Sequence, residues 1–314
     1  MSDKTYILCP GQGAQVVGMG KDYYAASPFA AQIFNRANDV LGFDLKTLCF
    51  AGPDERLNQT DVSQPAIYVT SVASFRAAQD AGLIDPALVT AYAGLSLGEY
   101  TALHLAGVFS FEEGLKLVAA RGRYMQEAAV ATPSGMVAIM GADADAVAKL
   151  CRENAEGEVL VPANYNAPGQ IVVSGSKPAC ERILHAAETA GFKATALKVA
   201  GAFHSPIMQV GADRMKLELD KAKFETPRAK VYSNVTAQPH GDTQSIKRLL
   251  VEQIVNSVRW EQTMQTLIGG GEARFVELAP GRTLAGLAKR INRRLPIESL
   301  ATAEVLSARG AASH

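Results

Sequence analysis

Residues 94–98 read Gly-Leu-Ser-Leu-Gly, a spacing that can place a nucleophile at a sharp turn. The preceding residues 88–93 are apolar and typical of a strand, and the residues from Leu97 onward have helical spacing. A serine between a strand and a helix, with a glycine two positions away on each side, fits a nucleophile elbow. The same residues can form a simple tight turn, but the flanking strand and helix favour the elbow. The sequence therefore predicts that Ser96 forms a covalent acyl-enzyme.

Such a reaction also needs N–H donors for the oxyanion of its tetrahedral intermediate. The N–H of Leu97 opens the helix after Ser96, where the positive end of the helix dipole favours negative charge. The second donor in an elbow site usually comes from a loop after a neighbouring strand. Residues 11–15 read Gly-Gln-Gly-Ala-Gln directly after a predicted strand, so we expect Gln12 to supply it. A dinucleotide-binding loop would need glycine or alanine where the chain has Val16.

The base that activates the serine must be found among five histidines. His185 falls on a predicted helix, His240 in a polar turn and His314 at the end of the chain. His104 lies on the elbow helix but points away from Ser96. His204 remains, in a loop before a predicted helix whose positive end disfavours an imidazolium. A lone loop histidine can be purely structural, yet elimination makes His204 the predicted base. No acid between Ser96 and His204 ends a predicted sheet strand, so we expect a serine–histidine dyad.

Arg121 lies on or beside the buried stripe of a helix predicted from Ser110 to about Ala129. A guanidinium in that position needs an anion, which is either a protein carboxylate or a free carboxylate of the substrate. The spacing leaves both possibilities open. The choice matters because an enzyme that hydrolyses neutral acyl chains has no use for a buried cation.

The order of predicted elements indicates two domains. Strands and helices alternate along residues 1–134 and 200–297, which favours a parallel, doubly wound sheet. Residues 135–199 follow the order strand, helix, strand, strand, helix, strand of a ferredoxin-like unit. We therefore predict an α/β fold, with a hydrolase-like parallel-sheet large domain and an inserted ferredoxin-like (βαββαβ) small subdomain. Residues 298–314 are the predicted C-terminal tail, and the site is expected where the two domains meet.

Caps and prolines set the predicted helix ends. Ser27 and Pro28 start a helix that runs toward Leu41, and another helix is expected from Pro65 to Ala81. After the inserted subdomain, a helix is expected to run from Ser205 to about Ala222.

The composition limits where this chemistry takes place. The 314 residues carry 31 basic and 31 acidic side chains, so the chain lacks the basic excess of a nucleic-acid-binding protein. No apolar run approaches the roughly 20 residues that span a bilayer, and no signal peptide is recognisable. The four cysteines are scattered without a CxxC pair, which suits reduced thiols. We expect a cytoplasmic protein that binds no metal, nucleic acid or membrane.

Seven stretches together give the chain a specific resemblance over nearly its whole length. They are PGQGAQ at 10–15, SQPA at 63–66, GLSLGEY at 94–100, ARG at 120–122, NYNAPGQ at 164–170, FHSPIM at 203–208 and ELAPG at 277–281. With these stretches the chain resembles the malonyl-CoA:acyl carrier protein transacylases of fatty acid synthesis. The fold of that family, a hydrolase-like α/β domain with a ferredoxin-like insert, agrees with the fold predicted above.

The resemblance implies that Ser96 is the nucleophile and His204 its base. The backbone N–H groups of Gln12 and Leu97 would form the oxyanion hole. Arg121 would bind the malonyl carboxylate. The main-chain carbonyl of Gln253 would orient the histidine, which accounts for the missing acid. Asn166 and Gln64 would be pocket residues. Phe203 resembles the malonyl-selective version of the family, because relatives that prefer methylmalonyl tend to carry a smaller residue there.

The same resemblance implies the reaction. Malonyl would pass from malonyl-CoA through a malonyl-serine to the phosphopantetheine thiol of an acyl carrier protein, for fatty acid or polyketide synthesis. Coenzyme A would be part of the substrate, and no cofactor is expected. A serine acyl hydrolase or thioesterase, and a non-catalytic scaffold that binds carrier proteins, are the alternatives. The family usually has histidine before the nucleophile, and Leu95 at this position puts the acyl selectivity in question.

The last predicted helix carries a group of basic residues. They form either a docking patch for an acidic carrier protein or an ordinary solvated helix face: Arg282, Lys289, Arg290, Arg293 and Arg294.

Overall fold

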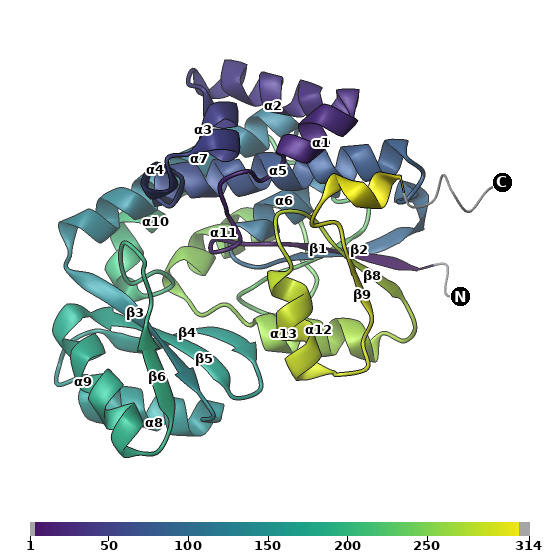
Figure 1. Cartoon of the computed structure of the whole chain (residues 1–314). Helices are drawn as coiled ribbons and strands as arrows, with labels where there is room; N and C mark the ends of the chain where they lie inside the picture. The colour runs from purple at the N-terminus through teal and green to yellow at the C-terminus, as the bar shows by residue number, and fades with distance from the viewer. Residues whose placement is uncertain (1–3, 308–314) are drawn as a thin grey trace.

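The structure, a computed structural model, describes residues 4–307 and contains two sheets of different kinds (Figure 1). All strand pairings in the larger sheet are parallel. Its strands lie in the order β7 (Lys230–Tyr232), β2 (Val89–Gly94), β1 (Thr5–Cys9), β8 (Arg274–Glu277) and β9 (Ile297–Ser299). The predicted α/β fold with a parallel-sheet large domain is confirmed.

Both faces of this sheet are buried, because alternate residues of the central strand join different cores. Ile7 and Cys9 point into the larger core, whereas Tyr6 and Leu8 point into the smaller one. The smaller core is covered by α12 (Trp260–Gly269) and α13 (Thr283–Ile291). The larger core receives side chains from α1 (Lys21–Ala26), α2 (Pro28–Leu41), α3 (Leu45–Ala51), α4 (Asp54–Leu57), α5 (Thr60–Asp80), α6 (Gly98–Leu105), α7 (Phe111–Ala131), α10 (Gln209–Lys221) and α11 (Thr243–Val255).

Two helix starts differ from the sequence prediction. Helix α5 begins at Thr60 rather than at Pro65, which lies inside the helix. The N–H of Thr60 donates to the side chain of Gln126 at 3.0 Å, so a tertiary contact satisfies a backbone group of the first turn. The helix expected from Ser205 begins as the 3₁₀ turn η2 (Pro206–Met208), and α10 follows it.

The smaller sheet is antiparallel, with strand order β4 (Leu160–Ala167), β5 (Gln170–Ser176), β3 (Ser134–Met140) and β6 (Lys193–Ala196). This order, with α8 (Ala144–Asn154) and α9 (Lys177–Thr189) packed in its own core, is the predicted ferredoxin-like arrangement. Met136 and Val172 instead join the larger core of the other domain. One face of the small sheet is therefore turned toward the large domain.

Backbone hydrogen bonds tie the two domains together between α11 and α12. The N–H of Val258 donates to the carbonyl of Ala163 at 2.8 Å, and its carbonyl accepts from Tyr165 at 2.9 Å. The small subdomain is thus held to the large one by paired backbone as well as by side chains.

The predicted tail starts inside the large sheet. Its first residues belong to β9, and the 3₁₀ turn η3 (Ala303–Leu306) follows with Ala303 buried. Residues 308–314 of that tail lie outside the described residues. The division of the chain at residues 134, 199 and 297 stays a prediction.

A further 3₁₀ turn, η1 (Pro86–Leu88), precedes β2. Among residues 4–307, no helix combines the length and apolar character that crossing a bilayer requires.

Candidate active site

Ser96 occupies a strained turn between β2 and α6. Its φ of 54° lies in the left-handed region, which non-glycine residues rarely adopt. The turn needs glycine on both sides, because a Cβ on Gly94 would strike the backbone of Gly98, and one on Gly98 would strike the carbonyl of Cys9. The Gly-x-Ser-x-Gly spacing therefore permits the close approach of strand and helix that lifts the serine.

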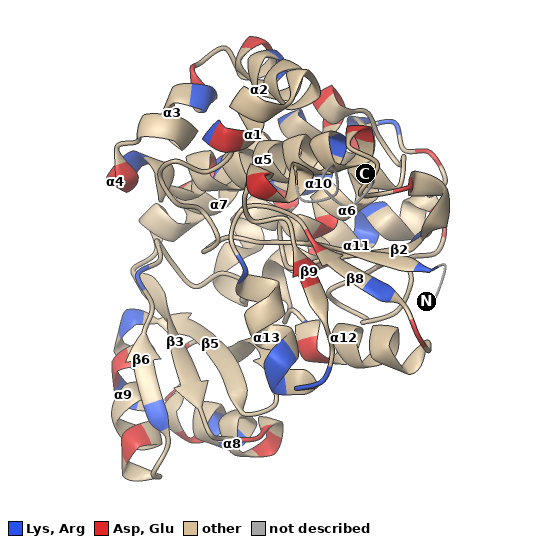
Figure 2. Cartoon of the chain, turned by 45° about the vertical axis from the view of Figure 1, so that its right-hand side comes forward, with Lys and Arg blue, Asp and Glu red and all other residues tan. Residues whose placement is uncertain are grey.

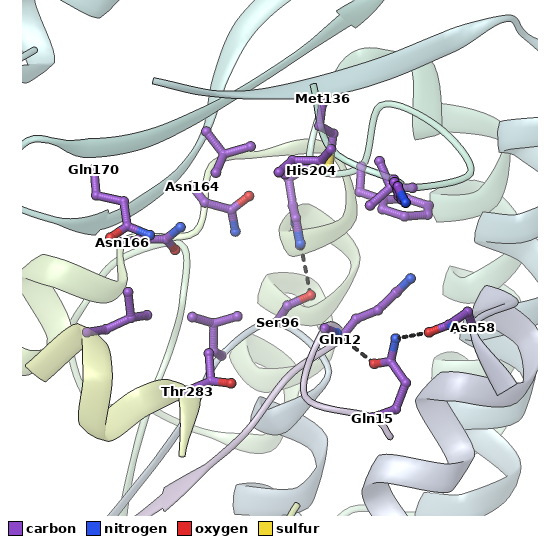
Figure 3. Close-up of a pocket in the computed structure, with 18 of the residues that line it drawn as sticks. Gln12, Gln15, Asn58, Ser96, Met136, Asn164, Asn166, Gln170, His204 and Thr283 are labelled. Atoms are coloured by element: carbon purple, nitrogen blue, oxygen red, sulfur yellow. Dashed lines mark hydrogen bonds between the residues drawn. The ribbon is translucent and has the colours of Figure 1, made fainter. Parts of the chain in front are cut away.

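The serine hydroxyl and a histidine form a buried pair. Ser96 Oγ lies 2.9 Å from His204 Nε2 (Figure 3). The other ring nitrogen, Nδ1, lies 2.7 Å from the carbonyl oxygen of Gln253. A carbonyl only accepts hydrogen bonds, so the geometry assigns the ring proton to Nδ1 and leaves Nε2 free to accept the serine proton. The predicted pairing of Ser96, His204 and the Gln253 carbonyl is present in the structure.

His204 is held in its neutral form. Burial, followed by the nearby positive charge of Arg121, lowers the pKa of His204 to about 4, although the hydrogen bond to Gln253 acts in the opposite direction. Burial, rather than the helix dipole expected from the sequence, keeps the ring neutral. It is the largest effect on this pKa, and the short turn η2 separates His204 from helix α10.

Arg121 is a buried cation next to the nucleophile. Its guanidinium donates to Ser96 Oγ at 3.1 Å, to Gln64 Oε1 at 2.6 Å and to Gln253 Oε1 at 2.8 Å. The residue is 1% exposed, and its Nε has no hydrogen-bond partner in the described part of the chain. Burial lowers the pKa of Arg121. Within residues 4–307, its hydrogen bonds go to neutral groups and no protein carboxylate forms an ion pair with it.

Of the two expected oxyanion donors, Gln12 lines the same cavity as Ser96, whereas Leu97 directly follows the serine and is fully buried. Neither the N–H of Gln12 nor that of Leu97 meets an acceptor among the described residues. The loop of Gln12 is fixed by the side chain of Gln15, which accepts from Gly13 N at 2.7 Å and donates to Asn58 Oδ1 at 2.8 Å (Figure 3). Both N–H groups therefore lack an acceptor among residues 4–307, as the elbow prediction requires.

A cavity of about 350 Å³ opens onto Ser96 between the two domains (Figure 3). Asn166 and Phe203 line it, as does Leu95 with its apolar side chain. Gln64 does not line the cavity. It is fully buried behind Arg121, where it accepts a hydrogen bond from the guanidinium, so its contribution is to hold Arg121.

Sequence reasoning missed Asn234. Its Oδ1 accepts the N–H of Ser96 at 2.6 Å, and its Nδ2 donates to the carbonyl of Gly94 at 2.7 Å, so one side chain ties both sides of the elbow. It also missed the side chain of Gln253, whose Nε2 donates to the carbonyl of Ser96 at 3.0 Å. A usable signal for Asn234 is that it follows β7, the neighbour of β2, and so lies at the same carboxyl edge of the sheet.

Comparison with known proteins agrees with this geometry. The family described as an acyl transferase domain matches residues 5–307. The malonyl CoA-acyl carrier protein transacylase of Escherichia coli K12 is 41% identical over 292 residues, covering 93% of this chain and 94% of the relative. The enzyme of that name from Bacillus subtilis is 38% identical over 305 residues, covering 96% of this chain and 95% of the relative.

Solved structures agree as well. The malonyl CoA-acyl carrier protein transacylase of Coxiella burnetii superposes with a TM-score of 0.93 at 38% identity, covering 96% of this chain and 95% of that one. A type II PKS acyl-carrier protein in complex with its malonyl-transacylase gives 0.92 at 38% identity, with 96% and 97% covered. From the domain match, the sequence identity and the shared fold, the chain belongs to the acyl transferase family and, within it, to the malonyl CoA-acyl carrier protein transacylases.

Proposed function

We propose that this chain transfers the malonyl group of malonyl-CoA to the phosphopantetheine thiol of an acyl carrier protein through a malonyl ester on Ser96. The names of its relatives support this substrate and this acceptor. The observation that carries the proposal is the guanidinium of Arg121, which forms no ion pair within residues 4–307 and lies 3.1 Å from the nucleophilic oxygen.

A cation in this position selects for an acyl group that ends in a carboxylate. A charged group without a protein counter-ion is costly to bury, and a bound dicarboxylic half-ester supplies the missing charge. The fork of guanidinium N–H donors matches a carboxylate geometrically. Arg121 would then hold the free malonyl carboxylate while the thioester carbonyl lies over Ser96 Oγ.

The first half-reaction loads the serine. Nε2 of His204 takes the proton from Ser96 Oγ, which attacks the thioester carbon, and the N–H groups of Gln12 and Leu97 stabilise the oxyanion. The Gln253 carbonyl balances the positive imidazolium through Nδ1–H. When the tetrahedral intermediate collapses, the C–S bond breaks and His204 returns its proton to the sulfur of coenzyme A.

The second half-reaction reverses these roles. His204 takes the proton of the carrier thiol, and the resulting thiolate attacks the carbonyl carbon of the malonyl ester. The C–O bond to Ser96 then breaks, and His204 returns the proton to Ser96 Oγ. Every proton and bond is accounted for by these residues, so we propose that no cofactor takes part. All four cysteines are free and buried, which suits the reducing cytoplasm, where we place the protein.

Incubation with malonyl-CoA and a phosphopantetheinylated acyl carrier protein tests the function. Malonyl-carrier should form in step with the release of free coenzyme A, and Ser96→Ala should abolish both. Release of free malonate without malonyl-carrier would show a hydrolase instead. No turnover of malonyl-CoA at all would favour the non-catalytic scaffold.

A further inference from the structure

Glu99 and His240 form a fully buried pair beneath the nucleophile elbow. Glu99 Oε1 lies 2.7 Å from His240 Nε2, and neither side chain has exposed surface. Neither residue lines the cavity around Ser96. A carboxylate buried in this way is stable only when its oxygens are fully hydrogen-bonded, so its partners show what the pair supports.

The second oxygen of Glu99 holds the two residues that shape the site. Oε2 accepts the backbone N–H of Asn234 at 2.9 Å and the side-chain Nε2–H of Gln253 at 2.7 Å. With His240 on Oε1, the carboxylate thus accepts three hydrogen bonds from two segments of the large domain, the loop after β7 and helix α11. Glu99 is the point at which these segments meet.

Asn234 and Gln253 carry this anchoring to the reacting groups. Asn234 Oδ1 accepts the N–H of Ser96, and the Gln253 carbonyl accepts Nδ1–H of His204. The Gln253 side chain also accepts a hydrogen bond from Arg121. The nucleophile, its base and the cation are therefore each one residue removed from the Glu99 carboxylate.

His240 makes one side-chain hydrogen bond, and it is directed at Glu99. Its Nδ1 is buried with no hydrogen-bond partner in the described residues. Its backbone is fixed, because the N–H of His240 donates to the carbonyl of Val231 in β7 at 2.8 Å. The imidazole therefore joins the sheet edge to Oε1 and prevents the carboxylate from rotating away from Asn234 and Gln253.

We propose that Glu99 and His240 are positioning residues for the transfer reaction. In this arrangement, the Nε2–H of His240 fixes the Glu99 carboxylate, which holds Asn234 and Gln253 so that His204 and Ser96 meet at hydrogen-bond distance. The inference rests on the proposed function, because its effect is on the rate at which Ser96 is acylated. Misplacement of reacting atoms by about 1 Å lowers rates by up to about 100-fold.

Two substitutions of similar length separate a positioning role from simple packing. His240→Gln keeps an N–H donor near the place of Nε2, whereas His240→Met fills the space without a donor. The exposed His185 on α9 gives a matched control, His185→Ala. Single-turnover acylation by malonyl-CoA, followed by intact mass, gives both the rate and the fraction of protein that reacts.

We expect His240→Met to lower the maximal acylation rate about tenfold or more. The loss of a hydrogen bond that positions a neighbour of the reacting residues commonly has an effect of this size. The concentration of malonyl-CoA for half-maximal rate should change less than about threefold, because the hydrogen bond to Gln64 still holds Arg121. His240→Gln and His185→Ala should stay close to the unsubstituted protein. A packing defect alone would lower the reacting fraction and the thermal stability while leaving the rate of the folded protein unchanged.

The proposal is overturned if His240→Met acylates at the unsubstituted rate, or if His240→Gln is as slow as His240→Met. Should neither variant fold, ¹⁵N spectra of histidine-labelled unsubstituted protein decide, because His240 must carry its proton on Nε2. A ring without a proton there contradicts the pair. If the unsubstituted protein itself forms no malonyl-serine, it is the proposed function that fails.

Discussion

His204 works as a base only while its ring is neutral, and the buried site keeps it so. Burial and Arg121 hold the pKa of His204 at about 4, well below that of an ordinary histidine. A lowered pKa means that the active form persists as the pH falls, until the pH approaches that value. We therefore expect the acylation rate to be flat from about pH 6 upward and to fall only toward about pH 4. Rapid-quench acylation across this range checks it, and a midpoint near 6.5, the value of an unperturbed histidine, would contradict it.

Arg121→Ala should separate malonyl from acetyl transfer. Loss of a charge-assisted hydrogen-bond pair costs about 1.5–3 kcal/mol, so malonyl acylation should fall roughly 10- to 100-fold more than acetyl acylation. Removing the positive charge also raises the pKa of His204, which moves the acid limb of the acetyl reaction to higher pH. Arg123→Ala, at an exposed position on the same helix, is the control. Equal losses with both acyl groups would refute carboxylate recognition.

The Gly-x-Ser-x-Gly motif pointed to Ser96, and elimination among the histidines pointed to His204. Neither kind of reasoning could predict the hydrogen-bond partners of Arg121. Helical spacing predicted that Arg121 is buried, yet it could not say whether a protein carboxylate lies opposite. That depends on Gln64 and Gln253, which come from helices far away in the sequence. Asn234 was missed for the same reason, because only strand pairing brings it to Ser96.

The elbow between β2 and α6 should tolerate no side chain at Gly98. A Cβ there overlaps the carbonyl of Cys9 in β1, so Gly98→Ala should lower the free energy of unfolding by about 1–3 kcal/mol and slow acylation. Gly286 on α13 is the matched control, because a Cβ there meets no atom within 4 Å. Gly286→Ala should leave stability unchanged or raise it by up to about 1 kcal/mol. Urea unfolding of both variants checks the pair, and equal stabilities would argue against the tight elbow.

The order of strands and helices was predictable because the spacing of apolar residues differs between the two kinds of element, and it changes wherever a strand gives way to a helix. The ferredoxin-like insert followed from this order alone, and its observed strand order confirms it. Element ends were less accurate where tertiary contacts decide them. Pro65 marked a helix start in the sequence, but a side chain from α7 supports an earlier turn at Thr60. Residues 298 and 299 were placed at the beginning of a tail because so short a stretch shows no pattern, whereas pairing with β8 makes them part of strand β9.

At the scale of the whole molecule, the cavity is a product of both domains. Ser96 and Leu287 come from the large domain, and Met136 and Asn166 come from the inserted one. The insert therefore forms a wall of the site rather than an appendage. The sequence predicted only that a site lies where the two domains meet. The pattern of apolar residues in each domain does not show which of its faces contacts the other domain.

Thr283 and Leu287 of α13 line that cavity, and the same helix and the turn after it carry basic residues (Figure 2). We predict that they receive an acidic carrier protein. Reversing charge at exposed Arg293 and Arg294 to Glu should raise the KM for the carrier about tenfold at low salt and leave malonyl-serine formation unchanged. Lys116→Glu, on exposed surface of α7, should change neither. An unaltered KM for the carrier would show that these basic side chains do not bind the carrier and only form a solvated face of the helix.

Intact-mass analysis after mixing with malonyl-CoA, and then with holo acyl carrier protein, tests the central claim most directly. We predict a malonyl mass shift that maps to Ser96, is lost in Ser96→Ala, persists in buffer and disappears when the carrier is added. A shift that clears in water at the same rate without the carrier, or a shift that survives in Ser96→Ala, would contradict the account.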